Sequence, residues 1–214
     1  MNGMNTARFI SDLGCLQFDN VFNPYRDRCG RSDRSNAPAM RRQTLRLMLD
    51  AAVQLEIDSI WIGRDLGYRG GRRTGLAFTD DRFFTAHCER WNITALLPTV
   101  GSEVHERTAA AVWKILNRTE SRIFLWNVFP FHPHLADHPF SNRAHNASER
   151  TAGIRVLSEL VTILQPKRLV CVGADAKQAL SAFDCELPVH QVRHPSFGGD
   201  KEFINRMTCL YDLS

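Results

Sequence analysis

Apolar residues recur along the chain in two alternating patterns, one typical of helices and one typical of buried strands. Between residues 41 and 56, leucine, methionine and alanine recur at helical intervals, which predicts an amphipathic helix. The next segment, 58–63 (DSIWIG), is a short apolar run ending in glycine and predicts a buried strand. The alternation continues to the end of the chain. Further strands are expected at 122–128, 168–173 and 189–193, and further helices at 80–90, 103–116, 148–165, 174–183 and from residue 200.

This alternation predicts the fold class. Short strands separated by helices are typical of an α/β protein whose sheet is mostly parallel. We expect a three-layer α/β/α sandwich with a central sheet of about four strands. Residues 1–214 are expected to form a single domain, because a chain of this length can bury one full hydrophobic core. Residues 1–40, which include the polar, turn-rich stretch 22–38, are expected to form an irregular segment over that core.

Composition adds expectations about compartment and partners. No apolar run approaches the roughly 18 residues of a membrane-spanning helix, and the first 15 residues lack the pattern of an export signal, so we expect a cytoplasmic protein. The six cysteines are irregularly spaced without a C-x-x-C pair, which predicts free thiols. Of 27 basic residues only four are lysines. Arginine suits phosphate binding and makes nucleic acid a candidate partner, although a G+C-rich genome would give the same composition.

Polar or glycine-rich segments follow three of the predicted strands. In a parallel sheet the carboxyl ends of the strands share one edge, and ligands bind beyond that edge. The sequence therefore predicts a site containing Asp65, Phe78, Asn127 and His194. The arginines expected to flank this site are Arg64, Arg69, Arg72 and Arg73. A carboxylate, an aromatic ring, an amide and an imidazole beside cationic groups suit a heterocyclic base next to phosphates.

The segment 63–78 (GRDLGYRGGRRTGLAF) resembles the first motif of the uracil-DNA glycosylases, Gly-Gln-Asp-Pro-Tyr followed by a stretch ending Gly-Leu-Cys-Phe. The positions that match in register are Gly63, Asp65, Gly75, Leu76 and Phe78. The pocket asparagine of that family follows an apolar strand, as Asn127 does, and its second motif begins His-Pro-Ser, as residues 194–196 do. The resemblance spans residues 57–199.

The resemblance implies a monofunctional DNA repair glycosylase that hydrolyses the N-glycosidic bond of uracil in single- or double-stranded DNA and leaves an abasic site. Asp65 would stabilise the positive charge on the sugar, and His194 would donate a hydrogen bond to uracil O2. The base pocket would comprise Gly63, Gly67, Tyr68, Phe78 and Asn127. The DNA contacts would comprise Arg64, Arg69, Arg72, Arg73, Ser196 and Phe197. We expect a monomer without metal or other cofactor.

Several residues depart from the family pattern. Arg64 replaces the glutamine before the aspartate, and Gly67 stands where the best-known members carry a tyrosine that excludes the methyl group of thymine. Tyr68 is the nearest replacement for that bulk. In the loop after His-Pro-Ser, Phe197 is the only wedge candidate. The chain lacks a compact N-terminal cysteine pair, so an iron–sulfur cluster is not expected.

Two other functions stay open. A module of the same fold could bind uracil-containing or abasic DNA with weak turnover. The stretch HPHLADHP places His132, His134 and His138 close together in the sequence, and three histidines could hold zinc in a metal-dependent hydrolase. The local spacing places no carboxylate partner beside these histidines.

Overall fold

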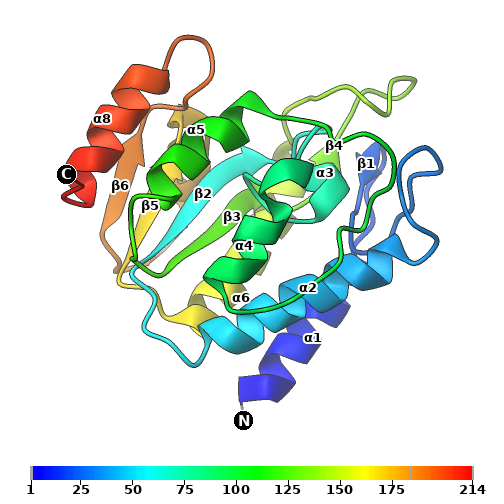
Figure 1. Ribbon diagram of the computed structural model, residues 1–214, viewed down its shortest axis with the longest axis horizontal. Coiled ribbons are helices and arrows are strands. Elements are labelled where there is room, and N and C mark those ends of the chain that lie inside the picture. Colours follow the sequence, from blue (N-terminus) through cyan, green and yellow to red (C-terminus); the bar gives the residue numbers. More distant parts are fainter. Residues whose placement is uncertain (1, 184, 214) are drawn as a thin grey trace.

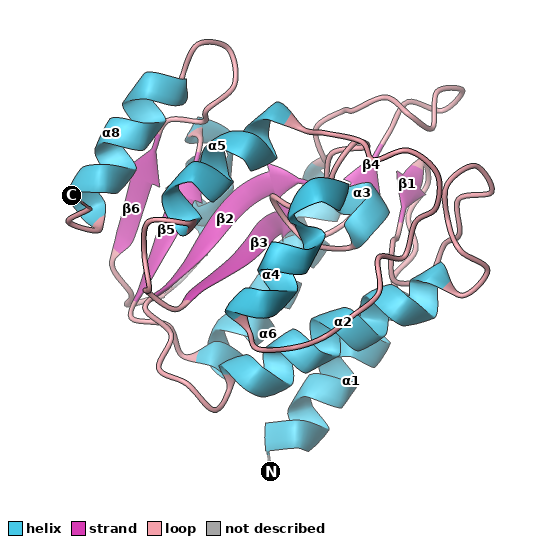
Figure 2. Ribbon diagram, in the orientation of Figure 1, coloured by secondary structure: helices cyan, strands magenta, loops and turns pink. Residues whose placement is uncertain are grey.

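The computed structural model describes residues 2–183 and 185–213 (Figure 1). Within these residues a four-stranded sheet in the order β3-β2-β5-β6 forms the centre, and every neighbouring pair of strands is parallel. Helices cover both faces of the sheet (Figure 2). This confirms the expected α/β/α sandwich. The strands are β2 (Ser59–Asp65), β3 (Ile123–Phe129), β5 (Arg168–Val172) and β6 (Val189–Val192).

The side chains of each strand alternate between two layers of the core. Ile60 and Ile62 of β2 belong to one apolar cluster, and Trp61 between them belongs to the other. The first cluster includes residues from α1 (Asn2–Cys15), α2 (Ala37–Ala52), α6 (Ala147–Leu164) and α7 (Ala174–Ala179). The second includes residues from α5 (Arg107–Leu116) and α8 (Asp200–Leu210). Because both faces of the sheet are covered, the strands are continuous apolar runs in the sequence.

Short elements surround this sandwich. They are α3 (Gly71–Thr74), η1 (Asp81–Phe83), α4 (Phe84–Arg90), η2 (Leu180–Ala182) and an antiparallel pair of β1 (Val21–Phe22) with β4 (His132–Pro133). At the end of α4, the ring of Trp91 packs against Phe124 of the edge strand β3, with centroids 5.5 Å apart. The β1–β4 pair joins the N-terminal part of the chain to the loop that follows β3. That loop borders the site described below.

The N-terminal segment differs from the expectation. Residues 1–40 were expected to be irregular, but α1 begins at Asn2 and α2 begins at Ala37. Three apolar side chains of α1, Phe9, Ile10 and Leu13, are buried in the same cluster as residues of α2 and α6. Tertiary packing therefore stabilises a helix whose own sequence is polar and contains two glycines. Only the stretch between β1 and α2 is the loop that the turn-rich composition predicts.

Two expectations from the composition concern the state of the cysteines and the presence of a membrane-spanning helix. All six cysteines are unpaired, and Cys29, Cys88 and Cys171 are buried. Across residues 2–183 and 185–213, no helix has the combined length and apolar character that crossing a membrane requires.

Candidate active site

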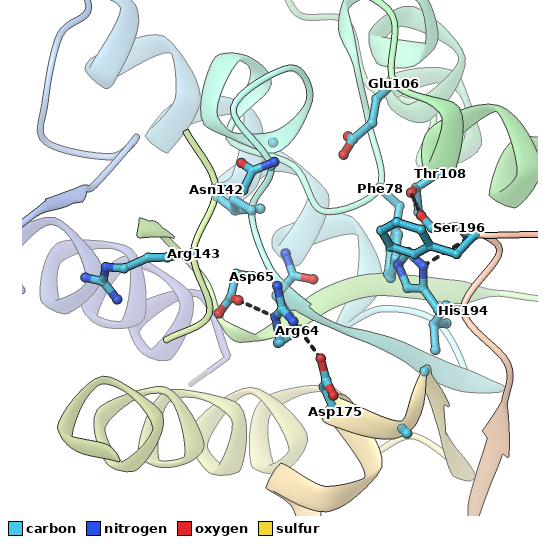
Figure 3. A pocket seen from close by; sticks show the side chains of 18 residues that line it. Arg64, Asp65, Phe78, Glu106, Thr108, Asn142, Arg143, Asp175, His194 and Ser196 are labelled. Atoms are coloured by element: carbon cyan, nitrogen blue, oxygen red, sulfur yellow. Dashed lines mark hydrogen bonds and ion pairs between the residues drawn. The ribbon is translucent and has the colours of Figure 1, made fainter. Parts of the chain in front are cut away.

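A cavity of about 510 Å³ lies beyond the carboxyl ends of the strands (Figure 3). This volume is within the range typical of small-molecule sites. Its walls bring together residues that lie far apart in the sequence but come from the ends of neighbouring strands. The predicted site residues that line it are Arg64, Asp65, Gly67, Phe78, Asn127, His194, Ser196 and Phe197. The structure therefore brings these eight predicted residues to one cavity.

Asp65 is the last residue of β2, and its side chain is only 6% exposed. Both carboxylate oxygens have a partner. Arg64 Nε donates to Oδ2 at 2.7 Å, and Nδ1 of His145 lies 2.5 Å from Oδ1. The Arg64 guanidinium also reaches Asp175 of α7 at 2.6 Å, as the dashed lines in Figure 3 show. The carboxylate is thus held in a fixed orientation at the floor of the pocket.

Phe78 and Asn127 form an aromatic and amide pair beside Asp65. Gly63 is opposite Asn127 in the β2–β3 register, and a side-chain carbon at Gly63 would lie 2.6 Å from the Phe78 ring and would overlap the Asn127 amide. Glycine at position 63 therefore lets these two side chains meet. Phe78 adopts a left-handed φ of 53°, and its carbonyl accepts a hydrogen bond from Trp113 Nε1 at 3.1 Å. Among the described residues, none is hydrogen-bonded to the Asn127 amide, which leaves it available to a ligand.

His194 follows β6, and its surroundings define its protonation. The backbone N–H of Ser196 donates to His194 Nδ1 at 3.1 Å, so Nδ1 carries no proton and the neutral ring carries its proton on Nε2. Burial lowers the pKa of His194, the charge of Arg64 lowers it further, and Asp175 opposes both. The imidazole is therefore a neutral donor. Ser196 in turn lies 3.3 Å from the hydroxyl of Thr108 on α5, which anchors the loop.

Five predicted residues do not line the cavity: Gly63, Tyr68, Arg69, Arg72 and Arg73. Tyr68 does not line the pocket within the described part of the chain. Its hydroxyl accepts a hydrogen bond from Arg69 Nε at 2.8 Å, and the Arg69 guanidinium lies 5.4 Å from its ring centre. Tyr68 is therefore not placed to replace the missing tyrosine bulk at position 67. Arg69 is exposed beside it and remains a candidate for phosphate contact.

The expected phosphate contacts of Arg72 and Arg73 are contradicted by their burial. Arg72 is only 5% exposed, and its guanidinium packs 4.0 Å from the centre of the Phe22 ring and 4.7 Å from that of Phe140. The Arg73 side chain is 11% exposed and forms an ion pair with the buried Asp81 at 2.7 Å. Both arginines hold the glycine-rich loop against the core, so little of either cation faces solvent.

Glu106 and His145 belong to the site but were not found from the sequence. Glu106 lines the cavity from the segment before α5, and His145 contacts Asp65 from the segment before α6. Burial raises the pKa of Glu106 to about 7, repulsion from Asp80 adds to the shift, and Arg69 opposes it. The only feature of the sequence that pointed toward Glu106 was the pair of glycines at positions 67 and 70. Side-chain carbons at those glycines would collide with its carboxyl group.

The three histidines considered for zinc do not form a metal site within the described residues. His132 is buried, its Nε2 lies 2.8 Å from the carbonyl of Ser141, and its ring centre lies 5.7 Å from that of His134. Burial and the charge of Arg72 lower the pKa of His132 to about 3. In the part of the chain that the structure describes, no three histidine, cysteine or acidic side chains are grouped as metal ligands.

The fold and the pocket together define a class of protein in which a carboxylate, a neutral histidine, an aromatic ring and an amide meet at the end of a parallel sheet. Residues 53–205 match the family model of the uracil DNA glycosylase superfamily. The chain belongs to this superfamily, a family of DNA glycosylases.

Comparison with solved structures gives a consistent result for the fold. The crystal structure of wild-type Pedobacter heparinus SMUG2 is similar, with a TM-score of 0.66 and 14% sequence identity over 97% of each chain. At this identity the similarity establishes the fold alone. A search of curated proteins finds no match to the chain.

Proposed function

We propose that this protein hydrolyses the N-glycosidic bond of uracil in DNA and leaves an abasic site. The observation that carries the proposal is the set of side chains around one cavity, Asp65, Phe78, Asn127 and His194, in which the carboxylate is fixed and the imidazole is neutral. A flipped base would stack on Phe78 and use the free amide of Asn127 for its N3 and O4 edge. No metal takes part in this scheme.

The reaction creates positive charge on the sugar and negative charge on the base, and the pocket has a side chain for each charge. The bond between C1′ and N1 breaks with its electron pair leaving on the base, a water oxygen adds to C1′, and the proton that the water loses neutralises the departing uracil anion. Asp65 stabilises the positive charge that develops on the sugar. His194 donates its Nε2 proton in a hydrogen bond to the uracil O2 that becomes negative. Membership of a DNA glycosylase superfamily supports this division of roles.

A second function is favoured by one observation. Both oxygens of Asp65 already have partners, Arg64 and His145, and such a carboxylate interacts less strongly with a cationic sugar. A binding module for uracil-containing or abasic DNA with weak turnover would have this property. Activity measurements separate the two functions.

The first prediction concerns Asp65. Asp65→Asn keeps the shape of the side chain but removes its charge, so the single-turnover rate should fall by about 10² or more while affinity for uracil DNA changes little. The assay incubates single- and double-stranded uracil oligonucleotides with purified protein in EDTA and then cleaves abasic sites with alkali. Asp137→Asn, an exposed aspartate in the loop before α6, is the matched control.

The outcomes distinguish the candidates. Strand breaks at uracil that depend on Asp65 support the glycosylase, whereas tight binding without breaks supports the binding module. Activity that disappears only with the chelator indicates a metal-dependent hydrolase. A folded Asp65→Asn protein with a near-normal rate rules out the proposed role of the carboxylate.

A further inference from the structure

Asp175 is a charged residue of the cavity wall to which the proposed mechanism gives no part. It is the second residue of α7, and its Oδ2 accepts a hydrogen bond from Arg64 Nη1 at 2.6 Å. In Figure 3 the Arg64 guanidinium lies between Asp175 and Asp65, with a dashed line to each. Across the described part of the chain, no other hydrogen bond to the Asp175 side chain is formed. One arginine therefore connects this carboxylate to the carboxylate that the mechanism uses.

The two contacts of the Arg64 guanidinium differ in how easily they can be broken. The Asp65 side chain is 6% exposed and is also held by His145, whereas the Asp175 side chain is 61% exposed. The Arg64 side chain is itself 40% exposed. An ion pair between exposed side chains contributes little to stability, because water screens the charges and both side chains lose freedom. The contact with Asp175 is therefore the one that another anion can displace.

The geometry of the Arg64 guanidinium favours phosphate as the displacing anion. A guanidinium binds phosphate best through two parallel N–H bonds. Because Arg64 Nε is bonded to Asp65, the edge left for such a contact is formed by Nη1 and Nη2, and Asp175 holds Nη1 through one oxygen. A phosphate on this edge must displace Asp175, and it gains two contacts for the one that is lost. Arg64 and Asp175 both line the cavity, next to which the phosphates of a flipped nucleotide must lie.

We infer that Asp175 competes with a DNA phosphate for Arg64, and thereby lowers the affinity for DNA and promotes release of the abasic product. The inference rests on the DNA binding in the proposed function. In the complex, a phosphate takes the Nη1 and Nη2 edge while Nε stays on Asp65, and Asp175 returns when the DNA leaves. An unpaired guanidinium beside Asp65 would oppose the positive charge that develops on the sugar. With Asp175 and phosphate as alternative partners, Arg64 is paired both before and during the reaction.

The exchange requires only the exposed side chain of Asp175 to rotate, because the backbone before α7 is fixed. The Gly173 N–H donates to the carbonyl of Val192 at 2.8 Å, and Gly173 has a left-handed φ of 103° that favours glycine. A side-chain carbon at Gly173 would lie only 3.2 Å from His194 Cβ. The start of α7 is therefore packed against the loop that carries His194. Asp175 can turn into solvent and back without any movement of the catalytic groups.

The test is a double-mutant cycle on DNA affinity with the wild type, Arg64→Gln, Asp175→Asn and the double variant. The probe is a duplex with a tetrahydrofuran abasic-site analogue, which the reaction cannot change, and affinity is measured by fluorescence anisotropy at several salt concentrations. Asp175→Asn should tighten binding by about threefold and slow dissociation, since the competing anion is removed. Arg64→Gln should weaken binding by about fivefold and reduce the slope of the salt dependence by about one unit. In the double variant, the aspartate substitution should lose most of its effect.

The matched control is Glu56→Gln, which breaks an exposed ion pair with Lys167 (2.8 Å) before β2 and β5, at the other edge of the sheet, and should leave affinity unchanged. Equal tightening by Asp175→Asn with and without the Arg64 guanidinium overturns the inference, because the aspartate then acts through its charge alone. An Arg64→Gln protein with wild-type affinity overturns it as well. The proposed function fails separately: coupling on the abasic probe without cleavage of uracil DNA refutes the glycosylase and leaves the competition intact.

Discussion

At the scale of single residues, His145 is one of the two side chains that hold the orientation of Asp65. Its Nδ1 lies 2.5 Å from Asp65 Oδ1, its side chain is 8% exposed, and it approaches from the segment before α6. His145 is therefore a positioning residue, because in the proposed reaction it acts on the base only through Asp65. Misplacing a catalytic group by a fraction of its contact distance is enough to lower a rate substantially.

His145→Ala should reduce the single-turnover rate on uracil DNA by about tenfold to 10² with little change in DNA affinity, because the carboxylate loses one of its two supports. His145→Asn keeps an N–H donor near the position of Nδ1 and should recover part of the loss. Rates are measured as a function of pH for the wild type and both variants. His138→Ala, an exposed histidine of the same loop, is the control. An asparagine protein no faster than the alanine protein, with an unaltered pH profile, indicates a packing role only.

The sequence identified some site residues and missed others for a physical reason. Asp65 is the last residue of β2, Asn127 lies in the last part of β3, and His194 follows β6. Parallel strands bring such positions to one edge of a sheet. Glu106 and His145 enter the site from segments that precede helices, and the path of such segments depends on tertiary packing. No periodicity records that path, and within its own segment neither residue differs from an ordinary polar residue at a helix start.

At the scale of elements, buried strands were predictable and the first helix was not. Ile60, Trp61 and Ile62 form an unbroken apolar run because both faces of β2 are covered, and a run of that kind is recognisable without a structure. In α1, the apolar residues Phe9, Ile10 and Leu13 do recur at helical spacing, but over little more than one turn. The helix is stabilised mainly by packing against α2 and α6, which the local sequence does not reveal.

The start of α6 fixes the segment that carries His145. Asn146 caps the helix by accepting from the Glu149 N–H at 3.0 Å, and the Glu149 carboxylate accepts from the Asn146 N–H at 2.8 Å. Arg143 adds a bidentate ion pair to Glu149, with both contacts at 2.7 Å, which holds the pKa of Glu149 below its usual value. The cap therefore stabilises the start of α6 and also fixes the position of the adjacent residue His145, which contacts Asp65.

Asn146→Ala should lower the free energy of unfolding by about 1 kcal/mol, the usual cost of losing such a cap. Because His145 is the adjacent residue, the rate on uracil DNA should fall as well. Urea unfolding gives the stability, and single-turnover cleavage gives the rate. Asn205→Ala, at an exposed position inside α8, serves as the comparison for replacing an asparagine outside a cap. Equal stability losses in the two proteins contradict a specific capping role.

At the scale of the whole molecule, the abundance of arginine says less about DNA binding than the composition suggests. Arg41 is buried and pairs with Asp33 at 2.6 Å, and Arg90 donates to the carbonyls of Leu116, Thr119 and Ser121. With Arg72 and Arg73 these arginines support loops from the inside. The DNA-facing cations must therefore be sought around the cavity, where Arg64 and Arg69 are at least partly exposed.

Among the described residues that line the pocket, Phe197 is the large apolar side chain that is exposed for contact with a DNA stack. Phe197 is fully exposed, at 101% of its reference area, and follows Ser196 on the rim. Its left-handed φ of 54° and the neighbouring Gly198 at 78° project it away from the core. An exposed aromatic side chain at this place suits insertion into the gap that a flipped nucleotide leaves in duplex DNA.

Phe197→Ala should therefore slow cleavage of uracil in duplex DNA by about tenfold and affect single-stranded DNA much less, because only the duplex must be unstacked and held open. The measurement is the ratio of single-turnover rates on the two substrates, with thermal unfolding as a check, since removal of a fully exposed ring should leave stability unchanged. Leu135→Ala, another exposed apolar residue but one that does not line the described pocket, is the matched control. If the cleavage rates of duplex and single-stranded DNA fall equally, Phe197 contributes to general DNA affinity and some other group opens the duplex.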